Sequence, residues 1–304
     1  MAYFPYIRGR QYDLLALKDL APHFSTPAIP NNPITIIEPV KTKLDDLEKI
    51  IMAYAKNPKN PQIILLTNPM VGDMPTLLDI ATLANKYPST VIPAFTPGNS
   101  KHTGTALDFL THITSDDVAI IHDNDRANAH SDNLAIRSAK NVLYEIEVGK
   151  LGPAYIGTFT APRILIEDAF GNHPNNSSYP PDEMFTASHI PPLPIGYSYF
   201  GDYTIMRRDY KEGGGKANAV ALHVSHTTPS EIRMKHFVSS PALIGSPAAV
   251  MYDDALNQLI AFSASPLALN TLGMQNFVAS KPKFPGLAKA KQFGMMHHIA
   301  LRSQ

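Results

Sequence analysis

Short apolar runs recur along the first two thirds of the chain, and most of them end in a charged or amide side chain. Stretches with a helical repeat of apolar residues separate most of these runs. This alternation is typical of parallel strands joined by crossover helices. The eight runs are YFPYIR (3–8), ITIIEPV (34–40), QIILLTN (62–68), TVIPAFT (90–96), VAIIHDN (118–124), VLYEIEV (142–148), RILIEDAF (163–170) and YSYFGDYTI (197–205). They predict an α/β fold, a TIM-type (β/α)8 barrel, whose strands meet with their carboxyl ends at one mouth.

The connections between the runs support this interpretation. Leu47, Ile50, Ile51 and Tyr54 fall on one face of a helix, and Asn57-Pro58 ends it. Further helices are expected over 11–20, 74–87, 106–113 and 132–140. Each lies between two predicted strands, as a barrel requires.

The alternation falters after the seventh run. The segment HPNNSSYPPDE (173–183) is polar and predicts a long loop, typical of a lid or substrate wall. Beyond the eighth run, NAVALHVSH (218–226) and IRMKHFVSS (232–240) predict a β-hairpin, and residues 253–304 predict a helical segment. We therefore expect one structural unit, with the barrel over 1–210 and a packed hairpin and helical extension over 211–304.

Composition narrows the classes of function. The 304 residues are 44% hydrophobic and 17% charged, which is enough for a large core. The 26 basic and 26 acidic residues cancel, which argues against strong general nucleic-acid binding. Cysteine is absent, so disulfides, thiolate nucleophiles and cysteine-ligated metals are excluded. A divalent metal ion, the one candidate cofactor, would need His, Asp, Glu or Asn ligands.

Targeting signals are not expected either. The N-terminus MAYFPYIRGRQYDLL lacks a basic segment followed by a long apolar stretch, and no window has 18 uninterrupted apolar residues. These features predict a cytoplasmic protein that does not engage a membrane.

Several segments together resemble a known family. They are YFPYIRGRQYDLLALKDL, ITIIEPVK, VAIIHDND, RILIEDAF, FGDYTI, HFVSS and FPGLAKAKQFGMMHHIAL. In this order they are similar to the beta-protein family of bacteria and phages, in particular its sce-type branch, from residue 3 to about residue 301. The resemblance implies a barrel and an origin in mobile elements or phage-related loci, sometimes beside a gene for a nuclease-like protein. It therefore implies a role in phage defence or element maintenance, but no reaction and no catalytic residue.

Polar residues at the strand ends are the candidates for chemistry. His122 and Asp123 leave one strand together and would ligate a divalent ion or act as an acid/base couple, although His122 is equally compatible with a packed core position. Glu38 would serve as a general base or ligand, or form an ion pair with Arg8 or Lys41.

Other candidates follow from strand alternation and local sequence. Glu145 and Glu147 share one face of a strand, and Glu147 with Lys150 is a possible site pair. Asp202 and Tyr203 lie in an otherwise apolar strand, where the carboxylate would be a ligand or the partner of an arginine. The predicted catalytic residues are Glu38, His122, Asp123, Glu147 and Asp202; the predicted substrate-binding residues are Arg8, Arg10, Lys150 and Tyr203; the predicted metal ligands are Asp123, Asp168 and Asp202.

Three further features are interpreted as structural. His223 and His236 lie on adjacent hairpin strands and are expected to face one another, and His297-His298 is expected to be a packed helix end. The glycines 213–215 lack the spacing of a phosphate loop and predict a flexible loop.

Two hypotheses for function follow. The first is an enzyme whose polar mouth hydrolyses a phosphate-bearing substrate by metal-assisted or acid/base chemistry. The second is a recognition component that binds a partner protein, including a nuclease-like one, in a phage-defence or mobile-element system. Fold does not decide between them.

Overall fold

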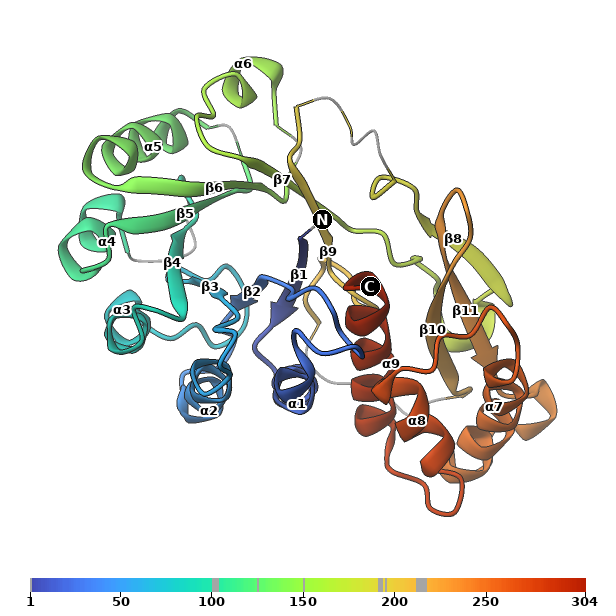
Figure 1. The fold of residues 1–304 in the computed structure, drawn as a ribbon. Coiled ribbons are helices and arrows are strands. Elements are labelled where there is room, and N and C mark those ends of the chain that lie inside the picture. Colours follow the sequence, from blue (N-terminus) through green and yellow to red (C-terminus); the bar gives the residue numbers. More distant parts are fainter. Residues whose placement is uncertain are drawn as a thin grey trace.

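Eight parallel strands close into a barrel, which confirms the predicted TIM-type fold (Figure 1). The structure is a computed structural model that describes residues 2–99, 104–124, 126–149, 151–190, 194, 196–211 and 218–304. The strand order is β1-β2-β3-β4-β5-β6-β7-β9. The bounds are β1 (Tyr3–Arg8), β2 (Thr35–Glu38), β3 (Ile63–Leu66), β4 (Val91–Phe95), β5 (Asp117–His122), β6 (Asn141–Glu147), β7 (Arg163–Glu167) and β9 (Tyr199–Asp202).

Six helices follow the strands around the barrel. They are α1 (Gln11–Leu20), α2 (Asp45–Ala55), α3 (Leu77–Lys86), α4 (Ala106–His112), α5 (Ala127–Ala139) and α6 (Pro153–Ile156). Local sequence explains where some begin, since the Thr76 hydroxyl accepts a hydrogen bond from the backbone of Asp79, and Thr105 and Asp108 form a capping box. Helix α3 therefore begins three residues later than the pattern predicts, and α5 begins five residues earlier.

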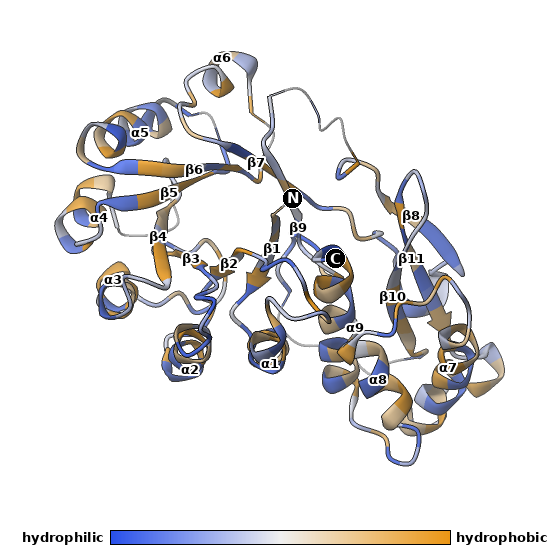
Figure 2. Ribbon diagram, viewed as in Figure 1, coloured by the Kyte–Doolittle hydropathy of each residue, from blue (hydrophilic) through white to orange (hydrophobic). Residues whose placement is uncertain are grey.

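Both faces of the barrel strands are buried. Figure 2 shows the strands largely hydrophobic, whereas the surrounding helices mix hydrophobic and hydrophilic residues. One side chain set, which includes Phe4, Ile64 and Ile146, fills the barrel interior, and the alternate set packs against the helices. The barrel closes between β1 and β9, where Phe4 lies opposite Gly201. A Cβ at Gly201 would overlap the carbonyl oxygen of Phe4, so this closure requires glycine.

One expectation about the strands is wrong. The predicted polar loop over 173–183 runs into a strand, β8 (Asp182–Thr186), which belongs to a separate antiparallel sheet. This sheet has the order β10-β11-β8 and contains the predicted hairpin, β10 (Ala221–Thr227) and β11 (Ile232–Val238). The eighth barrel strand, β9, is shorter than the predicted 197–205, because Thr204 takes a left-handed conformation with φ of 59°.

The C-terminal segment is helical, as predicted. It comprises α7 (Ala248–Ser263), α8 (Leu272–Ala279) and α9 (Leu287–Arg302). Among the described residues there are also three short 3-10 helices, η1 (Ala21–His23), η2 (Asn176–Ser178) and η3 (Pro241–Leu243). Helix α9 lies between α1 of the barrel and β10 of the small sheet (Figure 1). None of the helices in the described part of the chain has the length and apolar character needed to cross a membrane.

Candidate functional site

The barrel mouth is built around an ion pair between Arg8 at the end of β1 and Glu38 at the end of β2. Glu38 is fully buried and accepts further hydrogen bonds from the Tyr6 hydroxyl (2.7 Å) and the Met70 backbone (2.6 Å). Because both carboxylate oxygens are occupied, Glu38 is placed to hold Arg8 rather than to take a proton from a substrate. This realises the ion-pair alternative for Glu38.

Two aromatic rings pack against the Arg8 guanidinium. The Tyr6 and Tyr203 ring centroids lie 5.2 and 5.5 Å from its central carbon, and 4.7 Å from each other. Burial raises the pKa of Tyr203 far above its ordinary value, so its hydroxyl stays protonated. Tyr203 is 2% exposed, packs against the Arg8 guanidinium and does not line the cavity.

Asp123, which follows β5, lies at the same mouth and forms an ion pair with Arg208. The side chain of Asp123 is 25% exposed and that of Arg208 is 38% exposed, so both face solvent. The segment that carries Arg208 is held in place at its backbone: the Arg208 amide donates to Asp168 (2.9 Å), and its carbonyl accepts from Arg8 (2.5 Å). The mouth thus brings together four predicted residues, Arg8, Glu38, Asp123 and Asp168.

A cavity of about 630 Å³ opens above this arrangement. Its cationic lining residues are Arg8, Arg126, Arg208 and Lys211, and its acidic ones are Asp123 and Asp209. Two buried polar atoms in its lining, Nε of Arg8 and the hydroxyl of Thr96, have no hydrogen-bond partner in the structure. An excess of cationic groups with unused donors suits an anionic ligand.

His122 is not at the mouth. It precedes Asp123 by one residue, and strand alternation turns it toward the helix layer. There its Nε2 donates to Glu145 (2.6 Å), its Nδ1 accepts from Tyr155 (3.0 Å), and its ring stacks on Phe159. Burial lowers the pKa of His122 despite Glu145, which keeps the ring neutral. The packed-core alternative therefore describes His122, and its predicted role in the mouth is corrected.

Glu147 lies on the same helix-facing side as Glu145, as the alternation predicts. Its carboxylate accepts from the Tyr197 hydroxyl (2.6 Å) and lies 3.6 Å from Arg163. This position removes Glu147 from the mouth. Its predicted partner Lys150 lies outside the described residues, as do Asp125 and the glycines 213–215.

Asp202 is also corrected, because it faces α9 instead of the barrel interior. It is fully buried and accepts hydrogen bonds from Tyr3 (2.6 Å) and His298 (3.2 Å), while Arg302 lies 3.5 Å away. Burial alone would raise the pKa of Asp202, but His298 and Arg302 outweigh it and lower the pKa to about 2. Asp202 therefore fastens the C-terminal helix to the barrel.

The predicted metal ligands do not fit a common ion. Asp202 lies on the helix-facing side, Asp123 pairs with Arg208, and Asp168 lies 3.6 Å from Arg207. In the described part of the chain, no three acidic or histidine side chains come together as a metal site would need. Arg10, a predicted ligand-binding residue, forms an ion pair with Asp13 (2.7 Å) beside the mouth and lines an adjoining cavity.

The candidate residues missed at the sequence level are Thr96, Arg126, Arg208 and Lys211. The cationic pair Arg207-Arg208 comes two residues after the predicted eighth run (197–205), in the loop position where TIM-barrel site residues occur. This position in the sequence could have identified Arg208 as a candidate site residue.

Comparisons with family models, with curated proteins and with solved structures found no match to this chain. The site must accordingly be interpreted from its own geometry.

Proposed function

We propose that the barrel is an enzyme whose mouth binds a phosphate-bearing substrate and hydrolyses it by acid/base chemistry. The observation that carries the proposal is the environment of Arg8, which is 5% exposed and lines the cavity together with Arg126, Arg208 and Lys211. The Arg8 guanidinium is not fully satisfied within the protein, since its Nε has no hydrogen-bond partner in the structure. TIM-type barrels commonly host enzymes, with their sites at this end of the strands.

Phosphate binding would use the two guanidinium groups of Arg8 and Arg208. Arginine binds phosphate oxygens through paired N–H donors. An arginine side chain that is already fixed before the ligand binds loses less conformational entropy on binding. Glu38 and the two tyrosines hold Arg8 in place. Arg126 and Lys211 would add to the positive potential of the cavity.

The proposed chemical step uses Asp123, the predicted catalytic residue that lines the cavity. A water molecule adds to phosphorus while Asp123 takes its proton, the bond from phosphorus to the leaving oxygen breaks, and that oxygen takes a proton from solvent. Arg8 and Arg208 stabilise the charge that builds on the phosphoryl oxygens. No step is assigned to a metal ion, because the expected ligands are not gathered.

A second candidate function is recognition without turnover. It is favoured by the pairing of Glu38 with Arg8 and of Asp123 with Arg208. A paired carboxylate is a poorer base than an unpaired one. In this case the phosphate-bearing ligand would be a signal, and a nuclease-like partner protein would act on it within the phage-defence setting that the family resemblance implies.

Turnover assays separate the two candidates. Hydrolysis of bis(p-nitrophenyl) phosphate and p-nitrophenyl phosphate is measured for the wild type, for Asp123→Asn and for the control Lys49→Gln, which removes an exposed charge on α2. The enzyme proposal expects kcat to fall at least about 100-fold in Asp123→Asn only. Pyrophosphate binding without any turnover supports recognition. Absence of both binding and turnover contradicts both candidates.

A further inference from the structure

Three cavities adjoin one another between the barrel mouth and the small sheet. The first is the mouth cavity described above. A second, of about 290 Å³, shares Arg8 and Lys211 with it, and a third, of about 240 Å³, shares Phe170 and Tyr179 with the second. The shared lining residues place the three cavities side by side, with the second between the mouth cavity and the third.

The second cavity is strongly cationic. Its charged lining residues are Arg8, Arg10, Arg207, Lys211, Lys291 and a single carboxylate, Asp209. Arg10 and Arg207 are paired with carboxylates outside the lining, whereas Lys211 and Lys291 form no ion pair with a described residue. The cavity can therefore compensate more than one negative charge.

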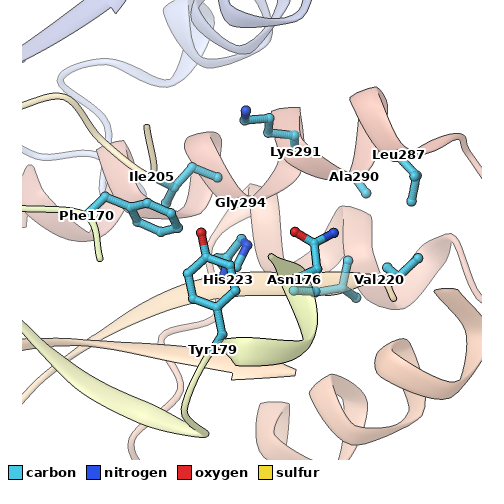
Figure 3. Close-up of a pocket in the computed structure, with 12 residues that line it drawn as sticks. Phe170, Asn176, Tyr179, Ile205, Val220, His223, Leu287, Ala290, Lys291 and Gly294 are labelled. Carbon is cyan, nitrogen blue, oxygen red and sulfur yellow. The ribbon is translucent and has the colours of Figure 1, made fainter. Parts of the chain in front are cut away.

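The third cavity is mainly apolar and aromatic. Figure 3 shows Phe170 and Tyr179 on the side of the small sheet, and Ala290 and Leu287 projecting from α9 on the opposite side. Ile205 closes the cavity toward the barrel. Its volume lies just below the usual range for a whole drug-sized ligand, which suits a single ring system.

Apart from Lys291, which the third cavity shares with the second, the polar groups of the third cavity carry no charge. Burial, and after it the neighbouring His236, lower the pKa of His223 well below its ordinary value, so the ring is neutral at pH 7. The predicted facing of these two histidines is confirmed, with their Nδ1 atoms 2.6 Å apart. The Asn176 amide is fixed at the rim because its nitrogen donates to the carbonyl of Ala219 (2.8 Å). Neutral donors and acceptors beside aromatic rings are what a nucleobase needs.

We infer that the ligand of the mouth is a nucleotide, with its phosphate at Arg8, which lines both the mouth cavity and the second cavity, and its base in the third cavity against Tyr179 and Phe170. The inference rests on the proposed function and names its substrate class. The order along the groove, cationic first and aromatic after it, matches the order of phosphate and base in a nucleoside phosphate. An anionic ligand without a ring system would have no group to occupy the third cavity.

The test compares two ligands that differ only in the base. Dissociation constants of AMP and ribose 5-phosphate are measured by titration calorimetry. Two variants impair the base pocket: Tyr179→Leu removes an aromatic face, and Leu287→Trp fills the rim from a position that is already 37% exposed. Matched controls are Tyr87→Leu, directly after the end of α3, and Leu134→Trp on α5, which lie outside the three cavities.

The inference predicts that the wild type binds AMP about tenfold more tightly than ribose 5-phosphate, or better, as stacking on an aromatic ring provides. Either pocket variant should remove this advantage and leave the affinity for ribose 5-phosphate unchanged, and the controls should keep it. Equal affinities of the wild type for the two ligands would overturn the inference while the proposed function stands. If neither ligand nor pyrophosphate binds, the proposed function falls as well.

Discussion

The carboxylate of Glu38 holds the guanidinium of Arg8 at the barrel mouth, and neither side chain is more than 5% exposed. Burying two charges is costly unless each is paired and hydrogen-bonded. Here Tyr6 and the Met70 backbone complete the coordination of Glu38, while Arg8 keeps an unpartnered Nε beside the cavity. The protein thus holds the pair in place, and Arg8 contributes to the lining of the mouth cavity.

Glu38→Gln should weaken both folding and binding. The change removes the partner of a buried charge, which typically costs about 3 kcal/mol. Urea unfolding should show this loss, and calorimetry should show pyrophosphate affinity reduced roughly tenfold because Arg8 is no longer held. The control Asp46→Asn removes an exposed carboxylate of α2. Wild-type stability together with wild-type affinity in Glu38→Gln would contradict the role of Glu38 as a positioning residue.

His122→Leu and Asp123→Asn should give opposite results although the residues are neighbours. Loss of His122 removes one buried hydrogen bond each from Glu145 and Tyr155, which keep Arg137 and Asn133 as partners, and is expected to cost roughly 1–3 kcal/mol of stability. Ligand affinity should change little, since His122 faces the helices. Asp123→Asn should leave the melting temperature nearly unchanged and abolish turnover. A loss of turnover in a folded His122→Leu protein would show that the outer face takes part in the chemistry.

Asp202→Asn should destabilise the protein without changing ligand binding. With a folded pKa of about 2 against an ordinary value near 3.9, the charged Asp202 contributes about 2 kcal/mol. Because the pKa is depressed in the folded state, this contribution is full above about pH 4 and is lost as the pH falls toward 2. Unfolding measured across this range should be steeper for the wild type than for Asp202→Asn. Parallel curves would argue that Asp202 is not the anchor of α9.

His297 should make the protein less stable in mild acid. Burial, supported by His298 and His226, lowers the pKa of His297 to about 4, while the Ser225 carbonyl only partly opposes the shift. The unfolded chain takes up the proton near pH 6.5, so stability falls as the pH drops from about 6.5 to 4, by up to about 3 kcal/mol. The variant His297→Gln should reduce this dependence in thermal melts. If His297→Gln shows the same dependence of stability on pH as the wild type, His297 is not the group that destabilises the protein in mild acid.

The barrel strands were predictable because parallel strands buried on both faces leave continuous apolar runs in the sequence. Strand β8 could not be predicted from the sequence, since Asp182 and Glu183 make its start polar and Met184 is 59% exposed. Its edge position in a small sheet removes the apolar signal. The C-terminal helices and the hairpin followed from ordinary periodicity and from proline breaks.

The site was predictable only in part, for a related reason. A run that is apolar on both faces does not reveal which face lines the barrel, so Asp123 could not be separated from His122, nor Tyr203 from Asp202. Alternation does predict that each pair divides between the two faces. Arg208 lies in an irregular segment after β9, where no periodicity points to it.

The most direct test of the account is the affinity of pyrophosphate for Arg8→Gln, compared by titration calorimetry with the wild type and with Lys49→Gln at one fixed ionic strength. Loss of hydrogen bonds between a charged donor and the ligand should weaken binding at least about tenfold. The account predicts this loss in Arg8→Gln and wild-type affinity in Lys49→Gln. Equal affinity in all three proteins would contradict the assignment of the barrel mouth as a phosphate site.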